Sequence, residues 1–160
     1  ASKDYPQAIY YRTGRGRDPE VYAPGVKFEI GKAIEHFKGN DITIIACGMP
    51  VHPALQVAKK LNAEGHSIGM IDMATIKPLD VDAVLEAAGR SRIILTIEEH
   101  NILGGLGSAV AEVMAENNTP AKLVRHGIKD EYSLIGPPTH LYGHYKLDEP
   151  GIEEVIRAQL

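Results

Sequence analysis

The side chains with the clearest chemical potential form one short run, in which Glu98, Glu99 and His100 follow an apolar segment. The apolar segment predicts a strand, and functional groups of α/β proteins usually lie at the carboxyl ends of strands. A carboxylate next to a histidine could form an acid–base pair, or a hydrogen-bonded structural pair. Successive strand residues point to opposite faces, so the two glutamates can reach one substrate only if the strand has already ended.

A glycine cluster follows, with Gly104, Gly105 and Gly107 between the predicted strand and a predicted helix. Phosphates often bind the free N–H groups at such a helix start. The dinucleotide fingerprint G-x-G-x-x-G is incomplete here, because a valine occupies its last glycine position, and the preceding carboxylates would repel a phosphate. Two interpretations stay open. Either these glycines form a ligand or anion site with Glu99 and His100, or they permit a tight turn and close helix packing, as at a subunit contact.

Near the N-terminus, Arg12, Arg15 and Arg17 alternate with glycines in the segment YYRTGRGRD. Glycine lets the backbone approach a ligand closely, and the guanidinium fork suits phosphate and carboxylate groups. A basic linker in water is the alternative interpretation.

Other reactive residue types lack the spacing that a site requires. His140 and His144 are four residues apart, but in a Pro- and Gly-rich context with no obvious third ligand, so no metal site is predicted. Cys47 precedes a glycine at a predicted strand end and is expected to be a packed, inert thiol. Neither a G-x-S-x-G elbow nor a Walker lysine motif occurs. We therefore assign no catalytic residue and no metal ligand.

The composition is that of a folded globular domain, with 44% hydrophobic and 24% charged residues among 160. A net charge of -4 gives no reason to expect nucleic acid or an anionic membrane as partner. The single cysteine excludes an intrachain disulfide and fits a reducing cytoplasm. No apolar run approaches the ~20 residues of a membrane helix, and the first residues do not form a signal peptide.

From residue 41 on, strand-like and helix-like patterns alternate with short connections, which predicts parallel pairing. The expected fold is α/β: a three-layer α/β/α sandwich around a mainly parallel sheet. Asp80 is the expected N-cap of the second helix, and Gly65 the stop of the first. The predicted strands span 41–48, 67–76, 91–100 and 121–130, and the predicted helices 50–65, 77–90 and 151–160. Residues 100–118 are predicted to form a glycine-rich turn followed by a further helix.

Three further segments are less regular. Residues 8–12 predict a short strand. Residues 28–39 predict either an antiparallel edge strand or a short helix. A loop is expected around Pro137 and Pro138.

The whole set of segments resembles the C-terminal section of transketolases, most closely the two-subunit type in which this region belongs to the smaller chain. The 1-deoxyxylulose-5-phosphate synthases and the β subunits of 2-oxoacid dehydrogenases are similar in this region. The histidine of EEHN and the segment HGIKDEY favour transketolase. In family order and covering nearly the whole chain, the matching segments are YYRTGRGRDPEVY, FEIGKA, DITIIACGMPVHPALQVAKKLNAEG, IDMATIKPLD, IEEHNILGGLGSAVAEV and HGIKDEY.

The resemblance implies a five-stranded mixed sheet with one antiparallel strand, the fold of the transketolase C-terminal domain. It assigns residues 31–160 to that domain, and residues 1–30 to a linker and the end of a pyrimidine-binding domain. Segments 8–12 and 28–39 would mark the end of that preceding domain and the connection from it.

The resemblance also implies an activity, the transfer of a two-carbon ketol unit between sugar phosphates with thiamine diphosphate and Mg²⁺. The family's GDG…N motif does not occur in this sequence, and the domain with its activating glutamate is missing. We therefore expect no cofactor on this chain alone, no activity of the isolated chain, and a role in assembly and in framing the substrate channel. The expected partners are the N-terminal transketolase domains or subunit, and a second copy in homodimer contacts. A ligand-binding regulatory module and an independent interaction domain are the alternatives.

The arginines gain a role from the resemblance. In the family, an arginine near the end of the pyrimidine-binding domain contacts the substrate phosphate. The segment RTGRG matches that region, so Arg12 or Arg15 would bind the phosphate in the complete enzyme, with Arg15 preferred.

Overall fold

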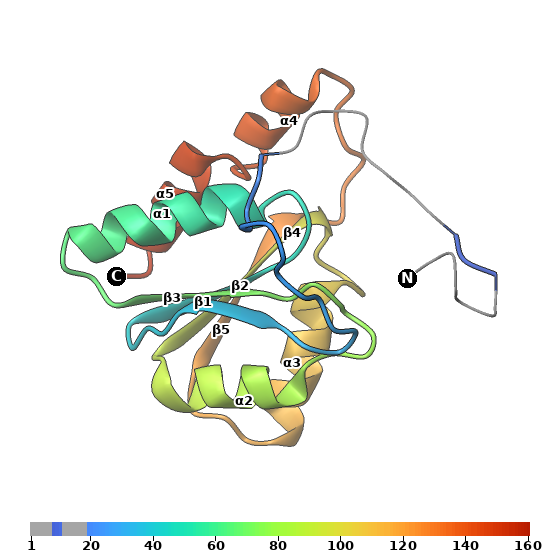
Figure 1. Ribbon diagram of the computed structural model, residues 1–160. Coiled ribbons are helices and arrows are strands. Elements are labelled where there is room, and N and C mark those ends of the chain that lie inside the picture. The colour runs from blue at the N-terminus through green and yellow to red at the C-terminus, as the bar shows by residue number, and fades with distance from the viewer. Residues whose placement is uncertain (1–7, 11–18) are drawn as a thin grey trace.

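The structure, a computed structural model, describes residues 8–10 and 19–160, and its centre is a five-stranded mixed sheet (Figure 1). The strand order is β1-β3-β2-β4-β5. The strands are β1 (Ile34–Phe37), β2 (Ile42–Ala46), β3 (Ile68–Asp72), β4 (Ile93–Asn101) and β5 (Lys122–Ile128).

β2, β3, β4 and β5 run parallel to one another, and β1 pairs antiparallel with β3. The predicted mixed sheet with one antiparallel strand is therefore confirmed, and so is the edge-strand interpretation of part of segment 28–39. The assignment of that whole segment to a connection out of another domain is wrong, because Ile34–Phe37 pairs within this sheet. The division into residues 1–30 and 31–160 stays a prediction.

Helices cover both faces of the sheet, which confirms the three-layer sandwich (Figure 1). The side chains of α1 and α5 pack on one face, and those of α2 and α3 on the other. A further short helix, α4, lies on the same side as α1 and α5. The helices are α1 (Val51–Ala63), α2 (Val81–Arg90), α3 (Leu106–Glu116), α4 (Pro138–His144) and α5 (Glu149–Arg157).

The strand sequences explain this double cover. All five residues of β2 and of β3 are buried, as expected of strands packed on both faces. Neighbouring residues alternate between the two layers: Ile44 belongs to the core beneath α1 and α5, and Ile45 to the core beneath α2 and α3.

The predicted helix boundaries are confirmed at two points. The Asp80 carboxylate accepts a hydrogen bond from the Ala83 N–H at 3.3 Å and caps α2. Gly65 follows α1 with a φ of +97°, a conformation that glycine adopts without strain.

Other predictions were wrong. The segment around Pro138 is the helix α4, because proline is tolerated in a first helical turn, where its missing N–H would have no partner. The strand predicted over 67–76 ends at Asp72, which is the last residue of β3 in register with β2. Ala8–Tyr10 forms no strand, and the rest of the predicted strand 8–12 lies outside the described residues.

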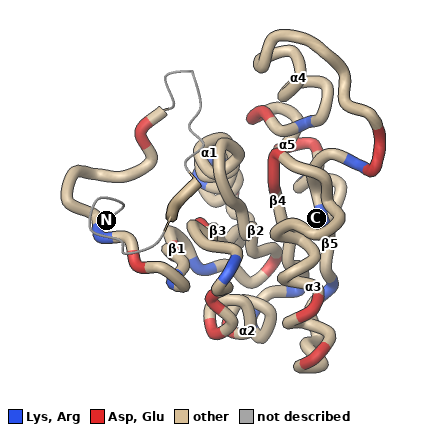
Figure 2. The backbone as a smooth tube through the Cα atoms, turned by 90° about the vertical axis from the view of Figure 1, so that its right-hand side faces the viewer, with Lys and Arg blue, Asp and Glu red and all other residues tan. Residues whose placement is uncertain are grey.

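Charges of both signs are interspersed on the described helices and connections (Figure 2). Among residues 8–10 and 19–160, no helix combines the length and the apolar character that a membrane span requires.

Candidate functional site

Glu98 lies near the carboxyl end of β4 and is completely buried. Its carboxylate accepts hydrogen bonds from the N–H groups of Leu106, at 2.9 Å, and Gly107, at 2.8 Å. These are the first residues of α3, whose N–H groups have no partner within the helix. A negative charge there is also stabilised by the helix dipole. Glu98 thus occupies the donors that a bound anion would use.

The glycines of the following turn are closely packed. A Cβ atom on Gly105 would overlap Glu98 Oε2, and one on Gly107 would lie 2.9 Å from Thr96 Oγ1. Gly104 has a φ of +77°, in the left-handed region. This geometry fits the tight-turn interpretation of the glycines, and the anion-site interpretation stays a prediction.

Glu99 points away from Glu98, toward α4. Its Oε2 accepts a hydrogen bond of 2.5 Å from the Tyr142 hydroxyl. His100 is exposed, and no hydrogen bond joins it to either glutamate in the described part of the chain. The strand alternation therefore places the two carboxylates on opposite sides, as the sequence predicted, and they form no acid–base pair with His100.

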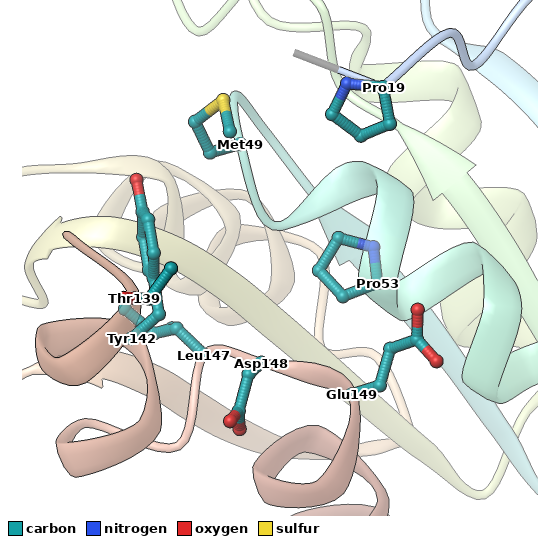
Figure 3. Close-up of a pocket in the computed structure, with 8 residues that line it drawn as sticks. All are labelled: Pro19, Met49, Pro53, Thr139, Tyr142, Leu147, Asp148 and Glu149. Atoms are coloured by element: carbon teal, nitrogen blue, oxygen red, sulfur yellow. The ribbon is translucent and has the colours of Figure 1, made fainter. Parts of the chain in front are cut away.

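A pocket of about 360 Å³ is lined by Tyr142, the hydrogen-bond partner of Glu99 (Figure 3). Apolar side chains form most of its wall, including Pro53 of α1 and Leu147. Asp148 and Glu149 add two carboxylates, but Asp148 already caps α5 by accepting from the Gly151 N–H at 3.0 Å. The sequence did not reveal this pocket, because its wall combines segments that are far apart in the chain.

A second buried carboxylate, Asp72, lies at the carboxyl end of β3 and is 7% exposed. The Tyr22 hydroxyl donates a hydrogen bond to it. The Tyr22 ring stacks on the His36 ring, with 5.4 Å between centroids and 24° between planes. Burial raises the pKa of Asp72 and lowers that of His36. No sequence motif indicated this cluster.

The remaining candidates do not form a reactive site. Burial, with Glu98, Asp72 and Glu99 nearby, raises the pKa of the Cys47 thiol to about 12, so the thiol is protonated near neutral pH. His140 and His144 both lie on α4. Within residues 8–10 and 19–160, no three His, Cys, Asp or Glu side chains could together hold a metal ion.

Thiamine diphosphate and Mg²⁺, which the resemblance implies for the complete enzyme, do not fit the described residues. The glycine-rich turn before α3 presents its N–H groups to Glu98, so a diphosphate would meet a carboxylate there. No described carboxylate group offers an Mg²⁺ site instead. Arg12, Arg15 and Arg17 lie outside the described residues, and their phosphate site stays a prediction.

The sequence and the fold match a known class of protein. The family model described as "Transketolase, C-terminal domain" matches residues 31–152, and the chain belongs to this family. It is 41% identical over 150 residues to a subunit of the apulose-4-phosphate transketolase of Phocaeicola vulgatus, covering 93% of this chain and 47% of that protein. It is 36% identical over 157 residues to 1-deoxy-D-xylulose-5-phosphate synthase of Ectopseudomonas mendocina, covering 98% of this chain and 24% of that one.

Among solved structures, the chain is similar to one titled "Split gene transketolase, inactive beta4 tetramer". The TM-score is 0.84 at 37% identity, and the match covers 92% of this chain and 48% of the other. This chain thus spans about half the length of these two transketolase chains, and about a quarter of the synthase.

Proposed function

We propose that this chain provides the C-terminal domain of an enzyme that transfers a two-carbon ketol unit between sugar phosphates. In that enzyme the chain assembles with N-terminal transketolase domains or a separate N-terminal subunit, and it frames the substrate channel without supplying a catalytic group. The observation that carries this proposal is the 41% identity with a protein named as one subunit of a transketolase. A reducing, cytoplasmic setting belongs to the same proposal and is supported by the lone cysteine.

The states of Glu98 and Cys47 support a non-catalytic role for these two residues. Glu98 is committed to two backbone N–H groups, and Cys47 is a protonated thiol. General acid–base catalysis needs a group that can exchange a proton with the substrate, and nucleophilic catalysis needs an activated nucleophile. Neither residue meets these requirements.

Reconstitution tests the proposal directly. The purified chain is mixed with thiamine diphosphate, Mg²⁺ and sugar phosphates, with and without the N-terminal transketolase subunit, and ketol transfer is followed. We expect no turnover by the chain alone and turnover when both parts are present. Turnover by the chain alone would contradict the proposal, and so would a reconstituted mixture that shows no turnover.

A second activity is favoured by the 36% identity with a 1-deoxy-D-xylulose-5-phosphate synthase. The reconstituted enzyme distinguishes the two by its products. Formation of 1-deoxyxylulose 5-phosphate in place of ketol transfer would select the synthase.

The proposed substrate contact is a phosphate bound by Arg15 or Arg12. A charge-assisted hydrogen bond lost in Arg15→Ala corresponds to roughly 1.5–3 kcal/mol, or a KM raised about 10- to 150-fold for a phosphorylated substrate. The KM for the unphosphorylated sugar should change little. Lys27→Ala, at an exposed position of the same N-terminal region, is the matched control. Equal changes for both substrates would refute the phosphate role.

Homodimer contacts are also part of the proposal. Sedimentation of the reconstituted enzyme tests them, and a complex that contains a single copy of this chain would contradict them.

A further inference from the structure

The pocket beside Tyr142 lies near the point where two connections of the sheet diverge. β2 continues into α1 on one face of the sheet, and the neighbouring β4 continues into α3 on the other face. Met49, between β2 and α1, lines the pocket, and Glu99 near the end of β4 accepts the hydrogen bond of Tyr142 in its wall. Open α/β sheets commonly bind ligands outside the carboxyl ends of their strands, where neighbouring connections diverge in this way.

The size and the wall of the pocket suit a small molecule. Its volume of about 360 Å³ lies near the lower end of the range of roughly 300–1,000 Å³ that small-molecule sites occupy. Pro53 of α1, Tyr142 of α4 and Leu147 of the α4–α5 connection supply apolar and aromatic surface from three elements. An apolar ligand would displace water from this surface, and that displacement favours binding.

The charge of the wall is negative. Among the described residues that line the pocket, Asp148 and Glu149 are acidic and none is basic. Asp148 accepts a hydrogen bond from the Gly151 N–H, and its carboxylate extends away from Pro53 (Figure 3). The Glu149 side chain extends toward Pro53, and no other residue in the described part of the chain forms an ion pair or side-chain hydrogen bond with it. An unpaired carboxylate beside an apolar wall is complementary to a cation with an apolar body.

We propose that this pocket binds a small organic cation: its ammonium group pairs with Glu149, and its apolar or aromatic body lies against Pro53 and Leu147. Tyr142 adds an aromatic side chain, and aromatic faces attract cations. An anion would be repelled by the two carboxylates of the wall. This binding is separate from the proposed ketol transfer, whose substrates are sugar phosphates and therefore anions.

Three probes with the same phenyl group and different end groups test the charge preference. 2-Phenylethylamine, 2-phenylethanol and 3-phenylpropanoate are titrated at pH 7.5 into the nitrogen-15-labelled chain, and the amide signals are followed by NMR. The amine should shift the signals of Leu147 and Glu149 saturably. It should bind about three- to fivefold more tightly than the alcohol, as for a partly exposed ion pair, and the carboxylate should bind most weakly. Equal dissociation constants for the amine and the carboxylate would overturn the proposal, and so would the lack of any saturable shift.

A charge-removing variant tests the role of Glu149. Glu149→Gln should abolish the preference for the amine and leave the dissociation constant of the alcohol unchanged. Glu116→Gln is the matched control, because Glu116 is exposed on α3, which packs on the other face of the sheet. It should leave the dissociation constants of all three probes unchanged. A preference for the amine that persists in Glu149→Gln would overturn the assignment of this residue.

The apolar body and the source of the ligand are tested separately. Methylammonium lacks an apolar body, so it should give no saturable shift at concentrations that saturate the pocket with 2-phenylethylamine. An equal response to both amines would show that the apolar wall is not used and would overturn the proposal. The amine should still bind after the N-terminal transketolase subunit is added. If that subunit displaces the amine, the pocket is an interface between subunits, and the proposal of a small-molecule site fails.

Discussion

Glu98 and Asp72 are both buried carboxylates near the carboxyl ends of strands in one sheet, yet their partners differ completely. Glu98 accepts from two N–H groups only eight and nine residues further along the chain. Asp72 is bound by the hydroxyl of Tyr22, fifty residues earlier. A carboxylate at a strand end can therefore stabilise its own βα unit, or fix a distant segment to the sheet.

The two sites also differ in how strongly they stabilise the charged carboxylate. The α3 N-terminus presents two fixed backbone donors and a favourable dipole to Glu98. Asp72 receives a side-chain hydroxyl, and burial still raises its pKa although Tyr22 and His36 lower it. We infer that Glu98 is essential to a rigid unit, and that the Asp72 contact is weaker and can open locally.

The largest effect is expected from Glu98→Gln. The amide group must turn an N–H₂ toward one of the two helix donors, so at least one charge-assisted bond is lost in a buried place. We expect a loss of about 3 kcal/mol in the free energy of unfolding, measured by urea denaturation. Glu116→Gln, at an exposed position on α3, is the control and should change stability by less than ~0.5 kcal/mol. If Glu98→Gln and Glu116→Gln lowered the free energy of unfolding equally, the hydrogen bonds of Glu98 would not be important for stability.

Gly105→Ala tests the same unit by its packing. The backbone of Gly105 is extended, so alanine is not strained there, but its Cβ would overlap Glu98 Oε2. Moving the carboxylate from its donors should cost about 2 kcal/mol by thermal or urea unfolding. Gly89→Ala has open space in α2 and should instead stabilise by about 0.5–1 kcal/mol. If Gly105→Ala left the free energy of unfolding unchanged, the Glu98 side chain could move without cost.

The Asp72 region should respond to pH through His36. The folded state favours the neutral ring, since the pKa of His36 is lowered from 6.5, so its contribution is complete above pH 6.5 and is lost as pH falls from 6.5 through the lower folded pKa. His126 has the same direction of shift, mainly because burial lowers its pKa. Urea midpoints at pH 7.5 and 5.5 should therefore differ less in His36→Gln than in the wild type. An identical difference in both proteins would exclude His36 from this response.

The smallest effect is expected from Asp72→Asn. Asparagine still accepts the Tyr22 hydrogen bond and removes a charge whose burial raises the carboxyl pKa. The wild-type carboxyl contributes most below its ordinary pKa of 3.8, and this contribution is lost as pH rises through its folded value. At pH 7.5 we expect a change of about 1 kcal/mol or less, neutral or stabilising, in urea unfolding. A loss as large as that of Glu98→Gln would make the two carboxylates equivalent.

Much of the fold could be predicted from local patterns. The apolar run of β2 and the N-cap Asp80 depend on residues close in the chain, and so does the turn at Gly65. The helix at Pro138 could not be predicted in this way, because a proline in a first turn looks the same in sequence as one in a loop. The candidate sites divide likewise: the glycine turn is visible in the sequence, while the pocket and the Tyr22 cluster are not.

The sequence by itself determined the α/β class, the alternation of strands and helices from β2 to β5, and the family. These follow from periodicity and from ordered motifs, which are local in the chain. Only the tertiary structure decided what the acidic residues do. It placed Glu98 on the start of α3, Glu99 on Tyr142 and Asp72 on Tyr22. The physical reason is that a buried carboxylate must find donors, and the sequence does not specify which distant donors the folded sheet brings within reach.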